Sequence, residues 1–233
     1  MKIWAIGDLH LPGGDIKPMD VFGDHWKDHF VRIKEDWHAH VAPEDAVLIP
    51  GDISWAMHLS EALDDLREIG TLPGRIVILR GNHDYWWTSV SQLRAGLPPN
   101  MWALQNDAVD LGECVVCGTR GWTIPGTEGT DARDEKIYAR EAGRLTLSLQ
   151  AGKQIAAGRP MIAMMHYPPL YAEHQPEGTA FTKLMTEYGV CRCVYGHLHG
   201  QGIRRGFNGV HDGVRYDLTS CDALGFRLKD VSL

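Results

Sequence analysis

Short apolar runs alternate with segments of helical periodicity along the first hundred residues. The run 3–6 is apolar and bounded by turn residues, which is typical of a buried strand. Residues 21–41 carry large apolar side chains at the spacing of one helical face and predict a helix. The same order then repeats, with a strand predicted at 46–49, a helix at 59–70 and a strand at 76–79. Strands that alternate with helices indicate a largely parallel sheet covered by helices.

The pattern changes in the second half of the chain. Short apolar pieces separated by Gly and Asp predict consecutive strands between 101 and 122. Residues 133–157 include an alternating stretch, but the surrounding Ala, Arg, Glu and Lys favour a helix. Further strands are predicted at 161–165 and 191–195, a short helix at 181–188, and β-hairpins from 202 to 233. No repeat or low-complexity linker divides the chain, so we expect one domain over residues 1–233.

Composition and charge narrow the class of protein. The 233 residues are 44% hydrophobic and 23% charged, close to globular averages, and no stretch is apolar enough to cross a bilayer. The first residues lack the small-residue cleavage site of a secretory signal, so we expect a cytoplasmic protein without a membrane partner. A net charge of −7 and the absence of a Lys or Arg run disfavour nucleic acid as a partner.

Polar clusters follow the apolar runs at five places. They are Asp8 with His10, Asp52, Asn82 with His83 and Asp84, His166, and His197 with His199. The carboxyl ends of parallel strands meet at one edge of a sheet, where ligands bind in such folds. Each cluster alone is typical of a turn or of a surface histidine. Together they supply the oxygen and nitrogen donors that suit divalent ions of intermediate softness.

The order and local form of these clusters carry a family resemblance. The motifs D-x-H, G-D, G-N-H-D, H and G-H-x-H, spread over residues 8–199, resemble the calcineurin-like metallophosphoesterase family. The resemblance implies an α/β (α+β) fold, a four-layer αββα sandwich with a dinuclear metal site at one edge. It also implies that Asp8, His10 and His199 bind one metal. Asn82, His166 and His197 would bind the other, and Asp52 would bridge the two.

The resemblance further implies a dinuclear metal-dependent hydrolase of phosphate esters, with phosphodiesters favoured and monoesters as an alternative. We expect a metal-bound hydroxide to attack phosphorus. His83, oriented by Asp84, is expected to assist the leaving group as a proton donor. The two divalent ions are expected to be manganese, with iron or zinc as alternatives.

The residues that contact substrate are indicated by position and type. Proteins of this superfamily that dephosphorylate serine and threonine carry Asp-Arg shortly after the bridging Asp, and this chain lacks it, so a protein phosphatase is disfavoured. Arg120 is expected to bind phosphate, with Arg80 or Arg133 as alternatives. Aromatic side chains lie near the motifs, Trp86 among them. Packing is their default role, and stacking on a flat group of the substrate is the alternative hypothesis. The expected partner is therefore a small phosphate ester such as a nucleotide.

Two histidines near the motifs, His58 and His174, are further candidates for substrate contact, although an ordinary surface histidine is the expected role of each. Two other functions stay open at this point. One is a catalytically silent metal-binding interaction module, and the other is a nuclease, which the acidic composition disfavours.

Overall fold

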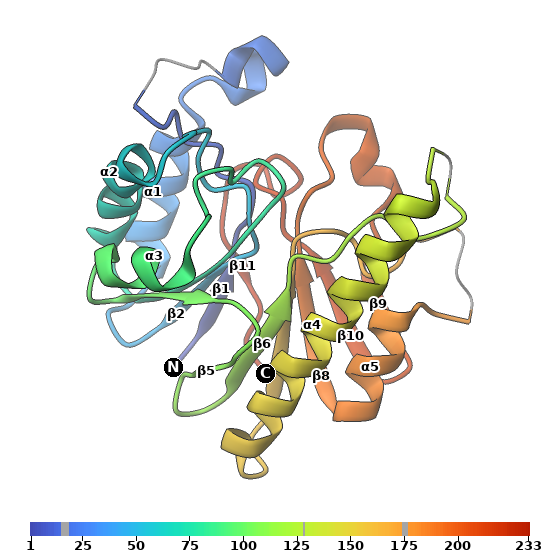
Figure 1. The fold of residues 1–233 in the computed structure, drawn as a ribbon. Helices are drawn as coiled ribbons and strands as arrows, with labels where there is room; N and C mark the ends of the chain where they lie inside the picture. The colour runs from blue at the N-terminus through green and yellow to red at the C-terminus, as the bar shows by residue number, and fades with distance from the viewer. Residues whose placement is uncertain (15–18, 128, 174–176) are drawn as a thin grey trace.

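The computed structural model describes residues 1–14, 19–127, 129–173 and 177–233, and it contains two β-sheets (Figure 1). The first sheet has the order β11-β1-β2-β3-β4. Its strands are β1 (Ile3–Ala5), β2 (Ala46–Ile49), β3 (Arg75–Leu79), β4 (Met101–Leu104) and β11 (Lys229–Asp230). Strands β1 to β4 run parallel, and β11 pairs antiparallel with β1. The largely parallel sheet predicted from the first hundred residues is confirmed.

The second sheet has the order β5-β6-β7-β8-β10-β9. Its strands are β5 (Val109–Asp110), β6 (Val115–Thr119), β7 (Met161–Met165), β8 (Val190–Tyr195), β9 (Gly209–His211) and β10 (Val214–Leu218). The four central strands are parallel, whereas the edge strands β5 and β9 are antiparallel to their neighbours. Asp212 and Gly213 join β9 to β10 with φ of 48° and 80°. This left-handed pair suits a two-residue hairpin turn.

Helices cover the outer faces of both sheets. The α-helices of the described residues are α1 (His29–His40), α2 (Leu59–Gly70), α3 (Val90–Gly96), α4 (Ala132–Ala156) and α5 (Ala180–Tyr188). Helix α4 confirms the helix predicted over the ambiguous segment 133–157. The carboxylate of Asp131 starts it by accepting hydrogen bonds from the backbone N–H groups of Arg133 and Asp134, at 2.7 and 3.0 Å. In the part of the chain that the structure describes, every helix is too short or too polar to span a lipid bilayer.

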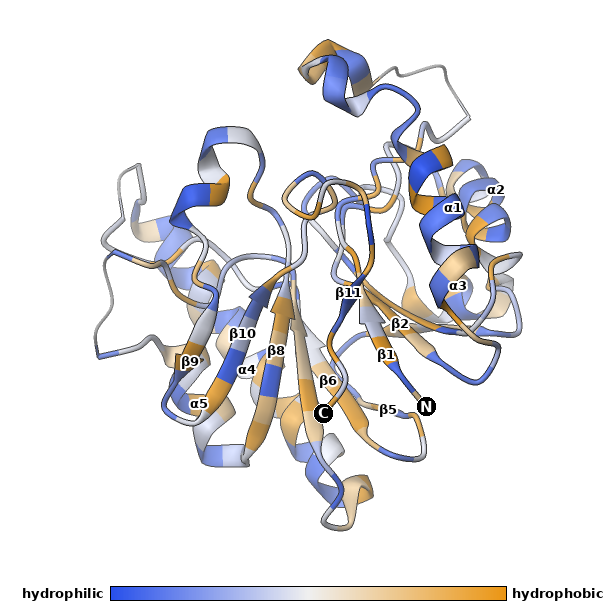
Figure 2. Cartoon of the chain, turned by 180° about the vertical axis from the view of Figure 1, so that it is seen from behind, coloured by the Kyte–Doolittle hydropathy of each residue, from blue (hydrophilic) through white to orange (hydrophobic). Residues whose placement is uncertain are grey.

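Side chains alternate along the strands and so build three layers of core. Leu48 of β2 and Met164 of β7 belong to the layer between the two sheets. Val47 packs with helices α1 to α3 on one outside, and Ala163 packs with α4 and α5 on the other. Figure 2 shows hydrophobic residues along the central strands and hydrophilic ones on the outer faces of the helices. The expected four-layer αββα sandwich is confirmed.

The helix predicted over residues 21–41 is wrong in its first part. Two short 3-10 helices, η1 (Met19–Phe22) and η2 (Asp24–Trp26), precede α1. Gly23 and Asp28 have φ of 129° and 52°, which a right-handed helix cannot contain. The apolar spacing continues across these breaks because Phe22 and Trp26 line a cavity, described below. Trp26 is also buried in the core that contains Ile33 and Trp37 of α1.

Two further predictions were correct only in part. The strands between 101 and 122 exist, but β4 completes the first sheet, whereas β5 and β6 begin the second. Of the hairpins predicted from 202 to 233, only β9–β10 forms. Residues 200–205 form the 3-10 helix η3 (Gly200–Arg205), and β11 returns to the first sheet. Periodicity within a strand does not state which sheet the strand joins, since that depends on long-range pairing.

Candidate metal centre

The predicted site residues lie where strands of both sheets end. Asp8 and His10 follow β1, Asp52 follows β2, Asn82 to Asp84 follow β3, His166 follows β7, and His197 and His199 follow β8. These strands are parallel within their sheets, so their carboxyl ends share one edge of the sandwich. The structure therefore brings together residues that are up to about 190 positions apart in the sequence.

Asp8, His10 and His199 form the first group of donor atoms. The Nε2 atoms of His10 and His199 are 3.3 Å apart, and Nε2 of His199 is 3.6 Å from Oδ1 of Asp8. The donor atoms of all three side chains lie within 4.8 Å of one another, which is close enough to share one ion.

Asn82, His166 and His197 form the second group. Oδ1 of Asn82 is 2.7 Å from Nε2 of His166 and 2.9 Å from Nδ1 of His197. The two ring nitrogens are themselves 3.3 Å apart. Three donor atoms from the segments after β3, β7 and β8 thus lie close together. They bring the first sheet and the second sheet into contact at this edge.

Asp52 lies between the two groups. Its Oδ2 atom is 3.5 Å from Nε2 of His166 and 4.0 Å from Nε2 of His10. Its Oδ1 atom accepts a hydrogen bond of 2.8 Å from the backbone N–H of His83. One carboxylate therefore faces both groups, as the resemblance had implied.

The backbone is strained at four of these residues. Asp8, His10, Asp52 and His197 have φ of 58°, 47°, 50° and 75°, in the left-handed region that non-glycine residues rarely occupy. Such conformations cost on the order of 1–3 kcal/mol each and cluster at functional sites. Backbone hydrogen bonds hold two of them, because Asp8 N donates to Gly51 O and His10 N donates to Asp52 O. The strain is consistent with side chains aimed at a common centre.

Two glycines allow the backbone to approach the carboxylates. A Cβ atom at Gly81 would overlap Oδ1 of Asp52, and one at Gly196 would overlap Oδ2 of Asp8. Neither carboxylate can move away, since both are almost fully buried. Any larger residue at these positions displaces a donor atom of the site.

In two of the histidines, a hydrogen bond from the Nδ1 atom fixes the orientation of the ring. Nδ1 of His166 donates to the Pro50 carbonyl at 3.0 Å, and Nδ1 of His199 donates to Oδ1 of Asp222 at 2.9 Å. Each bond turns Nε2 toward the centre, as is usual for histidines that bind metal. Asp222 was not predicted from the sequence. The available signal was an acidic residue in the turn that follows β10, another strand that ends at this edge.

Asp84 has a different role from the one predicted. Its carboxylate accepts hydrogen bonds from the backbone N–H groups of residues 52, 53, 54 and 81, at 2.7 to 3.2 Å. Both oxygens are thereby used, while Nδ1 of His83 has no hydrogen-bond partner among the described residues. Asp84 thus joins the loops after β2 and β3 and does not orient the His83 ring. Burial, and then the charge of Asp52, raise the pKa of Asp84 to about 7.

The two central carboxylates differ in charge state. Burial alone would raise the pKa of Asp8, but its hydrogen bond to His199 and the nearby histidines hold it well below its usual range. Burial, and then the charge of Asp8, raise the pKa of Asp52 to about 8. Among the described residues, no lysine or arginine pairs with either carboxylate. Divalent cations fit this set of buried oxygen and nitrogen donors, whose carboxylates are not paired with a lysine or an arginine that the structure describes.

The histidines are mostly held neutral. Burial, above all, lowers the pKa of His10 and of His197 to about 3 each. His199 is the exception, because its bonds to Asp222 and Asp8 outweigh burial and raise its pKa to about 10. Neutral imidazole is the form that binds metal. A cation that binds at the first group must therefore displace a proton from His199.

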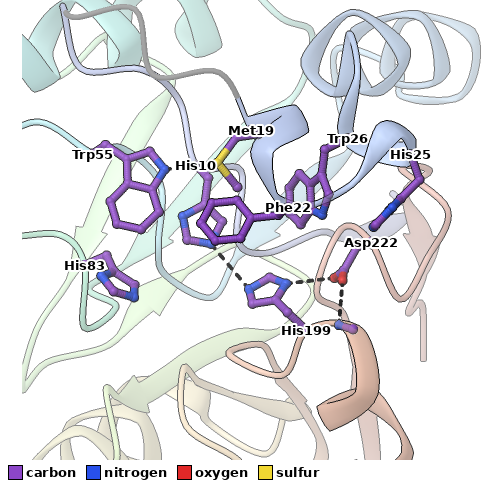
Figure 3. Close-up of a pocket in the computed structure, with 10 residues that line it drawn as sticks. His10, Met19, Phe22, His25, Trp26, Trp55, His83, His199 and Asp222 are labelled. Carbon is purple, nitrogen blue, oxygen red and sulfur yellow. Dashed lines mark hydrogen bonds and ion pairs between the residues drawn. The ribbon is translucent and has the colours of Figure 1, made fainter.

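An aromatic cavity of about 270 Å³ opens beside the first group (Figure 3). Its lining residues are His10, Met19, Phe22, His25, Trp26, Trp55, His83, His199, Gly200 and Asp222. Figure 3 shows Trp55 and His83 on one side and Trp26 on the other. The Trp55 ring stacks on His10, with centroids 4.8 Å apart, and lies 4.5 Å from His83.

Of the predicted substrate contacts, those that the structure describes do not line this cavity. Trp86 is only 1% exposed, and its Nε1 donates to the Ser54 carbonyl, so its ring packs in the core. His58 is exposed and begins α2, where the Glu61 side chain accepts from its backbone N–H. Arg120 points toward Glu141 on α4, 3.6 Å away. His174 lies outside the described residues.

Comparison with known proteins gives the fold and the family. Gene 66 protein of Mycobacterium phage D29 is 35% identical over 83 residues, which are 36% of this chain, and the match spans only 40% of that protein. Phosphopantetheinyl hydrolase from Mycobacterium tuberculosis is 16% identical, with a TM-score of 0.57 over 99% of this chain and 95% of that one. A protein of unknown function from Aquifex aeolicus is 14% identical, with a TM-score of 0.52 over 97% and 94%. A family model described as calcineurin-like phosphoesterase matches residues 1–201, and the chain belongs to that family.

Proposed function

We propose that this protein is a phosphoesterase that works with two divalent cations and favours phosphodiesters over monoesters. The observation that carries the proposal is the position of Asp52 between two groups of donor atoms. Asp8, His10 and His199 hold one cation, and Asn82, His166 and His197 hold the other. Asp52 contributes to both.

The cations supply positive charge for the phosphate group and lower the pKa of a coordinated water. With four positive charges against two carboxylates, the centre attracts an anionic ester although the protein carries a net charge of −7. Manganese is our first choice for both positions, and iron and zinc are the alternatives that oxygen and nitrogen donors accept.

His83 is placed to donate a proton to the leaving group. Its ring borders the aromatic cavity, and its Nδ1 atom is buried without a partner among the described residues. Packing against Trp55, and not a bond to Asp84, holds the ring. Its backbone N–H bonds to Asp52, so the ring stays close to the reacting centre.

The aromatic cavity supports a diester over a monoester. A diester has a second organic group, and the walls formed by Trp26 and Trp55 offer that group a flat, apolar surface. The Phe22 side chain lines the same cavity and is 62% exposed, so it does not pack in the core. A nucleobase is one flat group of suitable chemistry.

The test uses purified protein that is stripped with a chelator and then supplied with Mn²⁺. We expect hydrolysis of bis(p-nitrophenyl) phosphate to return and to exceed that of p-nitrophenyl phosphate. Asp52→Asn removes the shared carboxylate and should abolish both activities. Asp64→Asn, which changes a carboxylate exposed on α2, is the matched control and should retain them. Failure of every added metal to restore hydrolysis of either ester would refute the proposal.

A further inference from the structure

A second cavity, of about 340 Å³, lies at the same edge of the sandwich but is built from other residues. The residues that line it include the last residues of three strands, Leu79 of β3, Leu104 of β4 and Thr119 of β6. The lining also includes Arg80, Thr88, Arg120, Arg140, Glu141 and Arg144. It shares no lining residue with the aromatic cavity and contains none of the proposed metal ligands.

The charge of this arginine cavity is strongly positive. Four arginines line it against one carboxylate, that of Glu141, which leaves three positive charges uncompensated. Glu141 is fully buried, 2.6 Å from Arg144 and 3.6 Å from Arg120. Its other oxygen accepts a hydrogen bond from the Thr119 hydroxyl. The carboxylate of Glu141 therefore cannot also neutralise Arg80 and Arg140.

The side chains of Arg80 and Arg140 form no hydrogen bond or ion pair within the described ranges, 1–14, 19–127, 129–173 and 177–233. The Nε atoms of Arg80 and Arg120 are buried without an acceptor. A buried donor without a partner costs about 1–3 kcal/mol. The guanidinium groups of Arg80, Arg120 and Arg140 therefore have N–H donors that can bind an acceptor inside the cavity.

The arrangement of the arginines is unfavourable without a ligand. Arg140 and Arg144 are four residues apart on α4, and like charges at this spacing repel each other. Asn106 at the rim has a φ of 60°, another of the left-handed conformations that often mark binding loops. An anion relieves the repulsion and supplies the missing acceptors.

We propose that the arginine cavity is a second anion-binding site, which takes a phosphate or pyrophosphate group without help from a metal ion. Guanidinium groups bind phosphate oxygens in bidentate pairs, and the hydroxyl of Thr88 adds a further donor. Two sources share this chemistry. The anion is either a second phosphate group of the substrate or a free phosphate ion.

The binding test needs no turnover and so stands apart from the proposed phosphoesterase activity. Metal-stripped protein is titrated with inorganic pyrophosphate in a calorimeter. We expect binding that weakens as salt rises, and a loss of affinity of roughly tenfold in Arg140→Gln. Lys136→Gln also removes one positive charge from the same helix, but outside the cavity, and should bind like the wild type.

Both variants change exposed residues of α4, so we expect the protein to fold, and thermal melting checks this. Absence of pyrophosphate binding by the wild type, or equal affinity in all three proteins, would overturn the proposal. A second arm identifies the source of the anion in the Mn²⁺-loaded enzyme. If Arg140→Gln lowers kcat/KM for a pyrophosphate diester more than for bis(p-nitrophenyl) phosphate, the site holds a substrate phosphate. An unchanged ratio together with weaker pyrophosphate binding assigns the site to a free anion.

Discussion

At the scale of single residues, the histidines at this edge differ by what their second nitrogen meets. The Nδ1 atom of His166 bonds to a carbonyl and that of His199 to a carboxylate, so both rings are fixed with Nε2 inward. In His83 the Nδ1 atom has no partner among the described residues, and its ring faces the cavity. The first two rings are therefore suited to hold a cation, and His83 is suited to exchange a proton.

The role of His83 predicts a dependence on the leaving group. In His83→Asn, kcat for a diester with alkyl leaving groups should fall roughly 10²–10⁴-fold, since an alkoxide needs a proton to depart. For bis(p-nitrophenyl) phosphate the fall should be much smaller, because p-nitrophenolate leaves without one. Steady-state kinetics on both esters, with metal content measured alongside, checks this. Equal losses on the two esters would show that His83 positions substrate and does not supply the proton.

At the scale of elements, the sequence was most informative where the apolar residues keep the same spacing along a whole helix or strand. Strand β3 and helix α2 follow from local pattern. The strand buries both of its faces, one in each of two core layers, and the helix buries one face. The segment 19–28 does not, since Phe22 and Trp26 face a cavity that only the folded chain creates. The five ligand clusters were found because they directly follow strands. Asp222 was missed because β10 and its pairing with β8 are long-range features.

One carboxylate ties β1 to the turn before β2 and predicts an effect of pH on stability. Asp45 accepts hydrogen bonds from Lys2 N at 2.7 Å, Ala42 N at 3.1 Å and Trp4 Nε1 at 3.3 Å. Burial would raise its pKa, but these bonds lower it below the ordinary value. The ionised side chain therefore contributes stability above the unfolded-state pKa of about 4, and that stability is lost as the pH falls through the lower folded-state pKa.

Asp45→Asn should accordingly lower the free energy of unfolding by about 1–3 kcal/mol at pH 7. The difference from the wild type should shrink as the pH falls below about 4, where the wild-type carboxyl also becomes neutral. Urea unfolding of both proteins across this pH range gives the two curves. Asp64→Asn on the exposed face of α2 should shift stability by no more than about 0.5 kcal/mol. A difference for Asp45→Asn that does not vary with pH would contradict this account.

At the scale of the whole molecule, the candidate metal centre lies where the two sheets meet. Asp8, Asp52 and Asn82 come from loops of the first sheet, whereas His166, His197 and His199 come from the second. A cation that is held by residues of both sheets can bind only when the sheets are packed together. Binding to the folded chain alone must therefore stabilise the whole sandwich.

This linkage predicts a melting temperature that depends on metal. At a free Mn²⁺ concentration about 100 times the dissociation constant, the gain is about 2.7 kcal/mol, or roughly 5–10 °C for a chain of this size. Differential scanning calorimetry with chelator and with graded Mn²⁺ measures it. The gain should grow between pH 6 and 8, because Asp52, with its pKa raised to about 8, and the protonated His199 must release protons before they bind a cation. Asp52→Asn should lose most of the gain and Asp64→Asn none, whereas equal gains in both variants would mean that the stabilising ions bind elsewhere.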